Sequence, residues 1–336
     1  MKKRMLTRNE EERGHDHGVL GVLSTIQKAE FATQDQLDHL THIGYLTLKK
    51  TIANFGLTKR AAQNCHMHGD IFTSALREAT LACLRNLSSE DKFCKEEITS
   101  SVKYLAYKNP LDVYLQIKRL REIYPGLGSA MDIFEDPRLG HQFGVGNISG
   151  LPFAEGWFAF PNWRKKPQIF GRTYNVALQV AFSRLSSVFQ NRFKIAYGVN
   201  IGEEYIRQLK ATSECMAELI ESQEDRDILV IPAQLGMLHR GQSYRRALER
   251  IEKNNQECGL GVFAFANILL THPERLSGEG DLGVDCLGDE TCPSGNGTSF
   301  NSSPSFRWNN GGVEFLFRND DIPSPSFGAA SGFLPL

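Results

Sequence analysis

A basic turn that opens an expected helix is the first place in this sequence where chemistry could occur. His239, Arg240 and Ser243 precede Arg245 and Arg246, which fall in the first turn of that helix. The N-terminus of a helix presents free backbone N–H groups and the positive end of the helix dipole, and arginine pairs well with phosphate or carboxylate. The turn therefore predicts a site for an anionic small molecule, as a bound ligand or as the substrate of an enzyme.

This basic turn does not have the spacing of the common nucleotide-binding loops. Its glycines, Gly236 and Gly241, do not fit the dinucleotide fingerprint, and no Gly-Lys-Ser/Thr triplet follows them. The alternative interpretation is structural: Ser243 caps the helix, and the arginines lie on its solvated face. The sequence leaves both interpretations open.

A spaced run of acids, Asp281, Asp285, Asp289 and Glu290, is the second candidate. If one strand carried all three aspartates, they would share a face, because every second side chain of a strand points the same way. Carboxylates converging in this way could bind a divalent metal as cofactor of a hydrolase or nuclease. The shared face is lost if the strand ends at Gly288, and solvated turn acids are then the alternative.

The segment Trp157–Lys166 mixes aromatic with basic side chains. Nucleic-acid binding uses this mixture, because bases stack on aromatic rings while cations contact phosphates. A buried aromatic anchor followed by a solvated Arg164–Lys166 run is the alternative that the sequence favours. Together with the helical first third, this segment could instead be the contact surface for a protein partner. We therefore expect a non-catalytic binding or interaction protein, with the two enzymatic sites above as alternatives.

The composition is that of an ordinary globular protein and sets outer limits on function. The chain has 336 residues, a hydrophobic fraction of 41% and a formal net charge of −1. A net charge this small produces no overall electrostatic field that would attract nucleic acid or an anionic membrane. Seven cysteines are scattered along it, and neither a secretory segment nor an apolar run of about 18 residues is found. We expect a cytoplasmic protein with reduced thiols and no membrane span.

Hydrophobic periodicity predicts an α+β fold: a helical N-terminal part, then an α/β region with a mainly antiparallel C-terminal sheet. The expected organisation is a disordered tail at 1–18, a helical region at 19–124, a Gly/Pro-rich linker or shoulder at 125–171, and an α/β domain at 172–336. Later helices are expected at 109–124, 173–190, 203–221, 243–253 and 260–271. Strands are expected at 156–160, 228–231 and 281–287, with a hairpin at 306–317 and a C-terminal tail that docks through Phe333 and Leu334.

Four strings in the C-terminal half carry a resemblance to a known family: Ile231–Gln234, His239–Ser243, Thr271–Leu276 and Asp285–Glu290. From about residue 228 to residue 334 the chain resembles an uncharacterised bacterial protein family of unknown function. Because that family has no assigned activity, the resemblance implies no catalytic residue. It also implies nothing for the first third of the chain.

Overall fold

The computed structural model describes residues 63, 93–136, 151, 153–254 and 256–334. The chain divides into two compact units, residues 1–82 and residues 83–336. The elements below all belong to the second unit, which includes the Gly/Pro-rich segment 125–171. The expected tail at 1–18 and most of the expected helical region lie outside the described residues.

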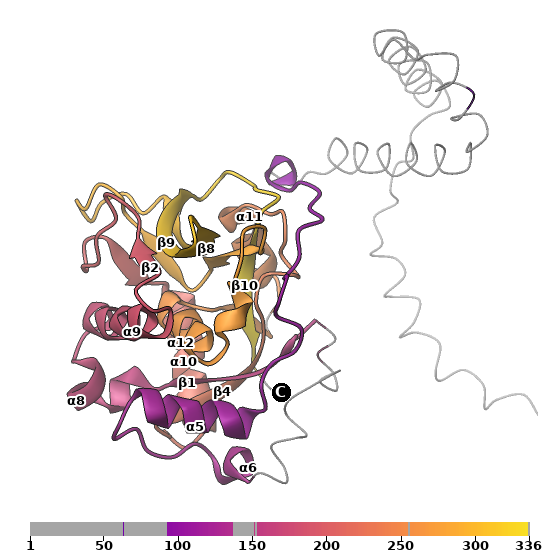
Figure 1. The fold of residues 1–336 in the computed structure, drawn as a ribbon. Coiled ribbons are helices and arrows are strands. Elements are labelled where there is room, and N and C mark those ends of the chain that lie inside the picture. The colour runs from indigo at the N-terminus through magenta and orange to yellow at the C-terminus, as the bar shows by residue number, and fades with distance from the viewer. Residues whose placement is uncertain (1–62, 64–92, 137–150, 152, 255, 335–336) are drawn as a thin grey trace, which may run out of the picture. The chain divides into compact units, whose positions relative to one another are not determined.

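The second unit is built around a ten-stranded mixed sheet (Figure 1). The main strand order is β1-β4-β10-β6-β8-β7-β3, with β5 paired to β10, β9 to β8, and β2 to β9. Among the strand pairs of the described residues, only β10–β6 and β2–β9 are parallel, so the expected α+β fold with a mainly antiparallel sheet is confirmed. The strands are β1 (Gly156–Pro161), β2 (Phe193–Ile195), β3 (Ile206–Gln208), β4 (Ile228–Gln234), β5 (Glu257–Gly259), β6 (Gly283–Cys286), β7 (Asp289–Thr291), β8 (Ser302–Asn309), β9 (Gly312–Asn319) and β10 (Phe327–Phe333).

Helices cover both faces of this sheet, as the alternation of side chains along its strands shows. Ala330 and Cys286 belong to the large core, whereas their neighbours Ala329 and Leu287 pack in a smaller cluster with α11. Successive strand residues point to opposite faces, so α11 lies across the sheet from the large core. The helices are α5 (Val113–Ile123), α6 (Asp132–Glu135), α8 (Pro167–Phe170), α9 (Tyr174–Val188), α10 (Lys210–Ser222), α11 (Tyr244–Glu252) and α12 (Val262–Thr271), with 3-10 turns η1 (Cys94–Glu96), η3 (Trp163–Lys165) and η4 (Pro273–Arg275).

Helix α12 is the centre of the large core. All of its residues are buried, and it packs against α9, β1 and α5, which lie around it in Figure 1. A helix that is apolar on every side is stable only in such surroundings. None of the described helices is both long and apolar enough to cross a membrane.

Local sequence signals predict the positions of several helices correctly. Helices α9, α11 and α12 fall in the expected ranges, and the side chains of Thr173 and Ser243 accept hydrogen bonds from the first turns of α9 and α11. Helix α5 begins later than its Asn-Pro signal indicates. Asp112 caps it by accepting from the Tyr114 N–H at 2.9 Å, while the Leu111 N–H donates to His272 Nε2.

The expected helix at 203–221 is wrong in its first part. Residues Ile206–Gln208 form β3, which pairs antiparallel with β7, and the helix α10 begins only at Lys210. A partner more than eighty residues away in the sequence therefore decides this conformation, and helical periodicity carries no information about it.

The C-terminal tail does more than dock, because Phe327–Phe333 is the central strand β10. Its small residues permit unusually close backbone approaches. A Cβ atom at Gly328 would lie 2.0 Å from the backbone carbonyl oxygen of Gly236, whereas one at Gly332 would lie 2.6 Å from the end of the Ile231 side chain. A glycine that suggests a loop in the sequence, Gly328, is therefore required here for close backbone packing.

Four phenylalanines from distant elements form the aromatic centre of the core. The ring centroid of Phe306 lies 5.0 Å from that of Phe315 and 5.5 Å from that of Phe265, and Phe182 lies 4.8 Å from Phe315. These rings join β8 and β9 to α9 and α12 through contacts of favourable tilted geometry.

We predict that Phe306→Ala lowers the free energy of unfolding by about 3–5 kcal/mol, because it leaves a cavity among these rings. Urea unfolding followed by circular dichroism measures the change. The matched control is Tyr197→Ala, since the side chain of Tyr197 is fully exposed. Equal, small effects of the two substitutions would contradict the central position of Phe306.

Candidate functional site

A cleft lined by aromatic side chains opens beside the N-terminus of α12. We call it the Trp163 cleft; it holds about 400 Å³ of space between its lining atoms, part of it open to solvent. Only a small part of this space is clear enough for a water molecule, so a larger ligand requires side chains at the mouth to move. The lining residues are Phe160, Pro161, Asn162, Trp163, Arg164, Tyr174, Gln208, Met216, Ile220, Leu229, Gly261, Phe263 and Ala264.

The turn after β1 holds Trp163 and Arg164 at this cleft. The Asn162 N–H donates to the carbonyl of Asp227 at 2.8 Å, which fixes the end of the strand. Lys165 pairs with Asp225 at 2.9 Å, and Lys166 pairs with Asp227 at 2.7 Å. The two lysines are thus paired with acids and are not among the residues that line the cleft.

The positive charge of Arg164 is available to a ligand, because its hydrogen-bond partners are neutral. Its guanidinium donates to the side-chain oxygens of Gln208 at 3.2 Å and Ser213 at 2.8 Å, and it lies 5.5 Å from the ring centroid of Trp163. All three are neutral groups. Within the described part of the chain, no carboxylate pairs with Arg164, whereas most other arginines near the candidate sites have one.

The inner end of the cleft is organised by the carboxylate of Asp289. Its Oδ2 accepts hydrogen bonds from the Val262 N–H at 2.6 Å and from the Tyr174 hydroxyl at 2.5 Å. The Phe263 N–H donates to the Tyr174 oxygen at 3.3 Å. A Cβ atom at Gly261 would lie 3.1 Å from Asp289, so this position favours glycine. Asp289 therefore caps α12 and orients the ring of Tyr174 in the cleft wall.

Burial changes the ionisation of both groups. It raises the pKa of Asp289 to about 7, although the hydrogen bonds from Tyr174 and Val262 act in the opposite direction. Burial, reinforced by the neighbouring Asp289 carboxylate, raises the pKa of Tyr174 well above its usual range. The tyrosine therefore stays protonated at neutral pH and acts as a hydrogen-bond donor.

In the structure, the side chains of this run of acids make separate contacts and do not share one site. Asp281 accepts from the N–H groups of Ser277 and Gly278, Asp285 pairs with Arg318 at 2.7 Å, and Glu290 pairs with Arg207 at 2.6 Å. Strand β6 lies within the expected range 281–287, but it ends at Cys286, and β7 begins only at Asp289. The three aspartates therefore do not lie on one strand, which is the case in which the shared face is lost. The described residues contain no group of three or more His, Cys, Asp or Glu that could hold a metal.

The residues of the basic turn bind the chain's own acceptors. His239 Nε2 lies 2.7 Å from Glu257 Oε1, and Arg240 donates to the carbonyl of Val102 at 2.8 Å. Burial raises the pKa of the Glu257 carboxyl, but the bonds from His239 and Ser331 outweigh it and hold the pKa below its usual range. His239 therefore faces an ionised internal carboxylate.

Two glutamates before the sheet, Glu96 and Glu97, bond to other side chains of this turn. Glu96 accepts from the Ser243 hydroxyl and from Arg245, both at 2.6 Å. Arg246 contacts Glu97 at 3.4 Å and Glu249 at 2.8 Å. An external anion would have to displace these carboxylates from the arginines. The anion site expected at the turn therefore stays a prediction, and the chain's own glutamates would compete with the ligand.

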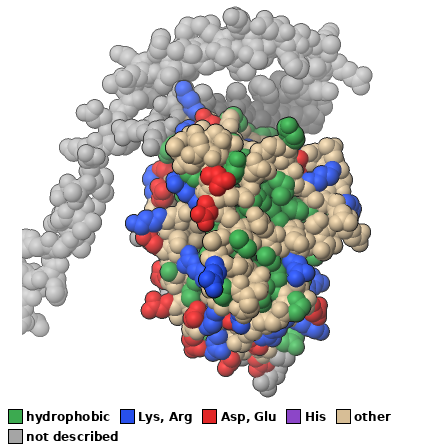
Figure 2. All heavy atoms as spheres, turned by 90° about the vertical axis from the view of Figure 1, so that its left-hand side faces the viewer, with side chains coloured by type: hydrophobic (Ala, Val, Ile, Leu, Met, Phe, Trp, Pro, Cys, Tyr) green, Lys and Arg blue, Asp and Glu red, His purple; other side chains and the backbone are tan. Residues whose placement is uncertain are grey.

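A separate, apolar groove lies between α9 and β2. Figure 2 shows hydrophobic side chains gathered on the face that carries α8, α9 and β2, with charged side chains around them. The groove has no charged side chain in its lining, unlike the Trp163 cleft. Its lining residues are Gln179, Phe182, Ser183, Ser186, Phe193, Ile195 and Ile201.

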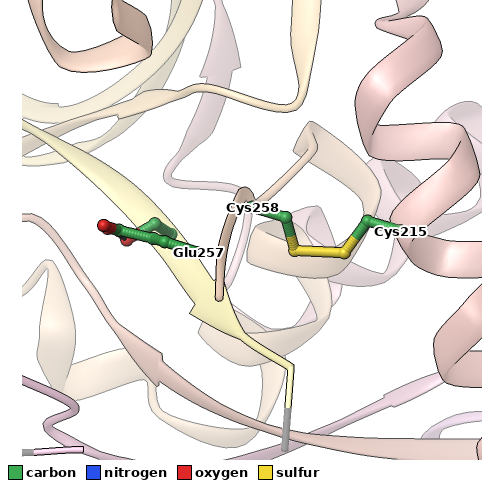
Figure 3. Close-up of a disulfide and its surroundings, with 4 residues drawn as sticks. Cys215, Glu257 and Cys258 are labelled. Atoms are coloured by element: carbon green, nitrogen blue, oxygen red, sulfur yellow. Dashed lines mark hydrogen bonds between the residues drawn. A yellow bond between two sulfur atoms is a disulfide. The ribbon is translucent and has the colours of Figure 1, made fainter. Parts of the chain in front are cut away.

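Cys215 of α10 and Cys258 of β5 form a disulfide, with their Cα atoms 6.6 Å apart (Figure 3). The expectation of reduced thiols is therefore wrong for this pair. The fold brings the two cysteines together across 43 positions of sequence, which no local spacing reveals. Cys286 and Cys292, which the described residues also include, are free and buried.

The sequence identifies only part of the Trp163 cleft. Trp163 and Arg164 belong to the aromatic and basic segment, but Trp157 packs away from them against Phe134, at 5.9 Å between ring centroids. From the sequence alone, Tyr174 is simply one residue of an expected amphipathic helix. Its position in a cleft follows from tertiary packing, and no pattern along the chain indicates it.

We predict that Asp289→Asn removes a pH dependence of stability. The native state holds the Asp289 proton up to about pH 7, whereas the unfolded chain releases it near about pH 3.9. The unfolded state therefore binds fewer protons in this window, and the free energy of unfolding falls as pH rises, by up to about 4 kcal/mol. The amide of the variant has no proton to lose.

Urea unfolding between about pH 4 and pH 7 tests this for the two proteins side by side. The difference in free energy between wild type and Asp289→Asn should change steadily in favour of the variant as pH rises. A difference that stays constant would show that Asp289 does not titrate in this range.

Comparison with known proteins gives no family for the chain: no family model, no curated protein and no solved structure matches it.

Proposed function

We propose that this protein is a non-catalytic binding protein, and that the Trp163 cleft holds a small planar ligand with an anionic group. The observation that carries the proposal is Arg164, a guanidinium without a carboxylate partner among the described residues, beside the ring of Trp163. A flat ligand can stack on the aromatic wall while its anionic group pairs with Arg164.

The chemistry of the lining supports binding over catalysis. None of the described residues that line the cleft is an aspartate, glutamate, histidine, cysteine or lysine. The one ionisable hydroxyl, that of Tyr174, is held protonated by burial and donates to Asp289. General acid–base or nucleophilic catalysis needs a group that titrates near the working pH and reaches the substrate.

The charges around the cleft favour a small molecule over a nucleic acid. Single-stranded nucleic acid is bound by a basic groove that follows its backbone, with several rings for stacking. Lys165 and Lys166, which would extend such a groove, pair with Asp225 and Asp227. Arg164 is the one cation among the described residues that line the cleft, and it matches one anionic group.

We predict that Arg164→Gln weakens the binding of naphthoate, a flat aromatic carboxylate, by about 10-fold or more. A hydrogen bond to a charged group contributes about 1.5–3 kcal/mol, and 1.4 kcal/mol corresponds to a factor of ten. Quenching of tryptophan fluorescence or titration calorimetry measures the dissociation constant.

Two controls test whether the pairing between the ligand carboxylate and the Arg164 charge is responsible for the change in affinity. Naphthylmethanol, which has the same rings without the carboxylate, should bind the wild type and Arg164→Gln with similar affinity. Arg172→Gln, at an exposed arginine that does not line the cleft, should leave naphthoate binding unchanged. If Arg164→Gln has no effect on naphthoate, or if wild type does not bind it in any redox state, the proposed function is wrong.

A further inference from the structure

We infer that the Cys215–Cys258 disulfide controls the Trp163 cleft: the oxidised protein holds the cleft narrow, and reduction lets it open for the ligand. This inference rests on the proposed function and adds its regulation. It arises from three observations about α10, which carries both a cysteine of the disulfide and part of the cleft.

The first observation is what α10 contributes to the cleft. Met216, next to Cys215, and Ile220, just over one turn further, form part of the cleft wall. Ser213, two residues before Cys215, accepts the hydrogen bond from Arg164 at 2.8 Å. A displacement of α10 would therefore move both the wall and the arginine at the mouth.

The second observation is how α10 is attached. Among the described elements, its most extensive contact is with β5, the strand that carries Cys258. Its N-cap residue, Leu209, has an apolar side chain that makes no capping hydrogen bond. The disulfide is thus a covalent tie across the main interface of this helix, as Figure 3 shows for Cys215 and Cys258.

The third observation is that Cys258, the other cysteine of the disulfide, lies on a strand that is held firmly in the sheet. Cys258 is paired with Gly332 of β10, and β10 lies between β4 and β6 in the sheet. Beside it, Glu257 accepts from His239 and Ser331, which are both buried. When the disulfide is cut, β5 keeps its position, and two hydrogen bonds between Gln223 and Val230 still hold the C-terminal end of α10. The N-terminal part of the helix is therefore what gains freedom.

The chemical step is thiol–disulfide exchange with a dithiol. A thiolate of the dithiol attacks one sulfur of the disulfide and forms a mixed disulfide, and the second thiolate of the dithiol then releases it. Two electrons and two protons pass to the protein, which gains the thiols of Cys215 and Cys258. The dithiol becomes a disulfide, so the exchange balances without a further reactant.

Reduction should increase affinity because the oxidised cleft has little clear space for a ligand. We expect naphthoate to bind the dithiothreitol-reduced full-length protein at least about fivefold more tightly than the oxidised protein, the lower end of ordinary coupling between sites. Circular dichroism on both forms shows whether the fold is retained.

Variants assign the effect to this disulfide. Cys215→Ser/Cys258→Ser should bind naphthoate like the reduced wild type, with or without dithiothreitol. Cys292→Ser, at a buried cysteine outside the disulfide, should keep the wild-type response. If the double variant does not fold, the comparison of oxidised and reduced wild type still decides the question.

The outcomes separate this inference from the proposed function. Equal affinity of the oxidised and reduced wild type, with Arg164→Gln still weakening binding, overturns the redox control and leaves the binding site in place. A dithiothreitol effect that persists in the double variant also overturns it. If Arg164→Gln has no effect in either redox state, the proposed function fails first.

Discussion

The carboxylate of Asp289 joins elements that the chain builds far apart. Its Oδ2 receives the Val262 N–H of α12 and the hydroxyl of Tyr174 in α9, while its backbone carbonyl accepts from the hydroxyl of Tyr244 in α11 at 2.9 Å. Because α11 lies across the sheet from the other two helices, the residue connects both helical layers through β7. An acid in this place is costly to ionise, and the raised pKa of Asp289 is the measure of that cost.

A second constraint concerns charge. Buried charged groups need polar partners, and in this chain the Asp285 carboxylate pairs with Arg318 and the Glu257 carboxylate bonds to His239. The chain also covers Arg245 with Glu96. Side chains that look functional in the sequence are therefore engaged in holding the fold. Arg164 differs because its partners are neutral and the cleft beside it is aromatic. Neutral partners leave a cation able to bind a ligand without first breaking an ion pair.

Elements whose signals are local could be predicted from the sequence. The caps at Thr173 and Ser243 and the hairpin turn at Asn310 and Gly311, both with positive φ, are determined by neighbouring residues. Strands β3 and β10 could not be predicted, since their conformations depend on partners distant in the sequence and on close backbone contacts of glycine. The candidate site divides in the same way: the aromatic and basic run is visible in the sequence, but its meeting with α9, α10 and α12 is not.

A crystal structure of the protein with naphthoate is the most direct test of the central claim that the Trp163 cleft binds a planar anion. We expect the naphthoate rings to stack against the aromatic wall and the carboxylate to lie within hydrogen-bonding distance of the Arg164 guanidinium. Naphthoate bound instead at the Ser243–Arg246 turn in place of Glu96, or in the groove between α9 and β2, would contradict it.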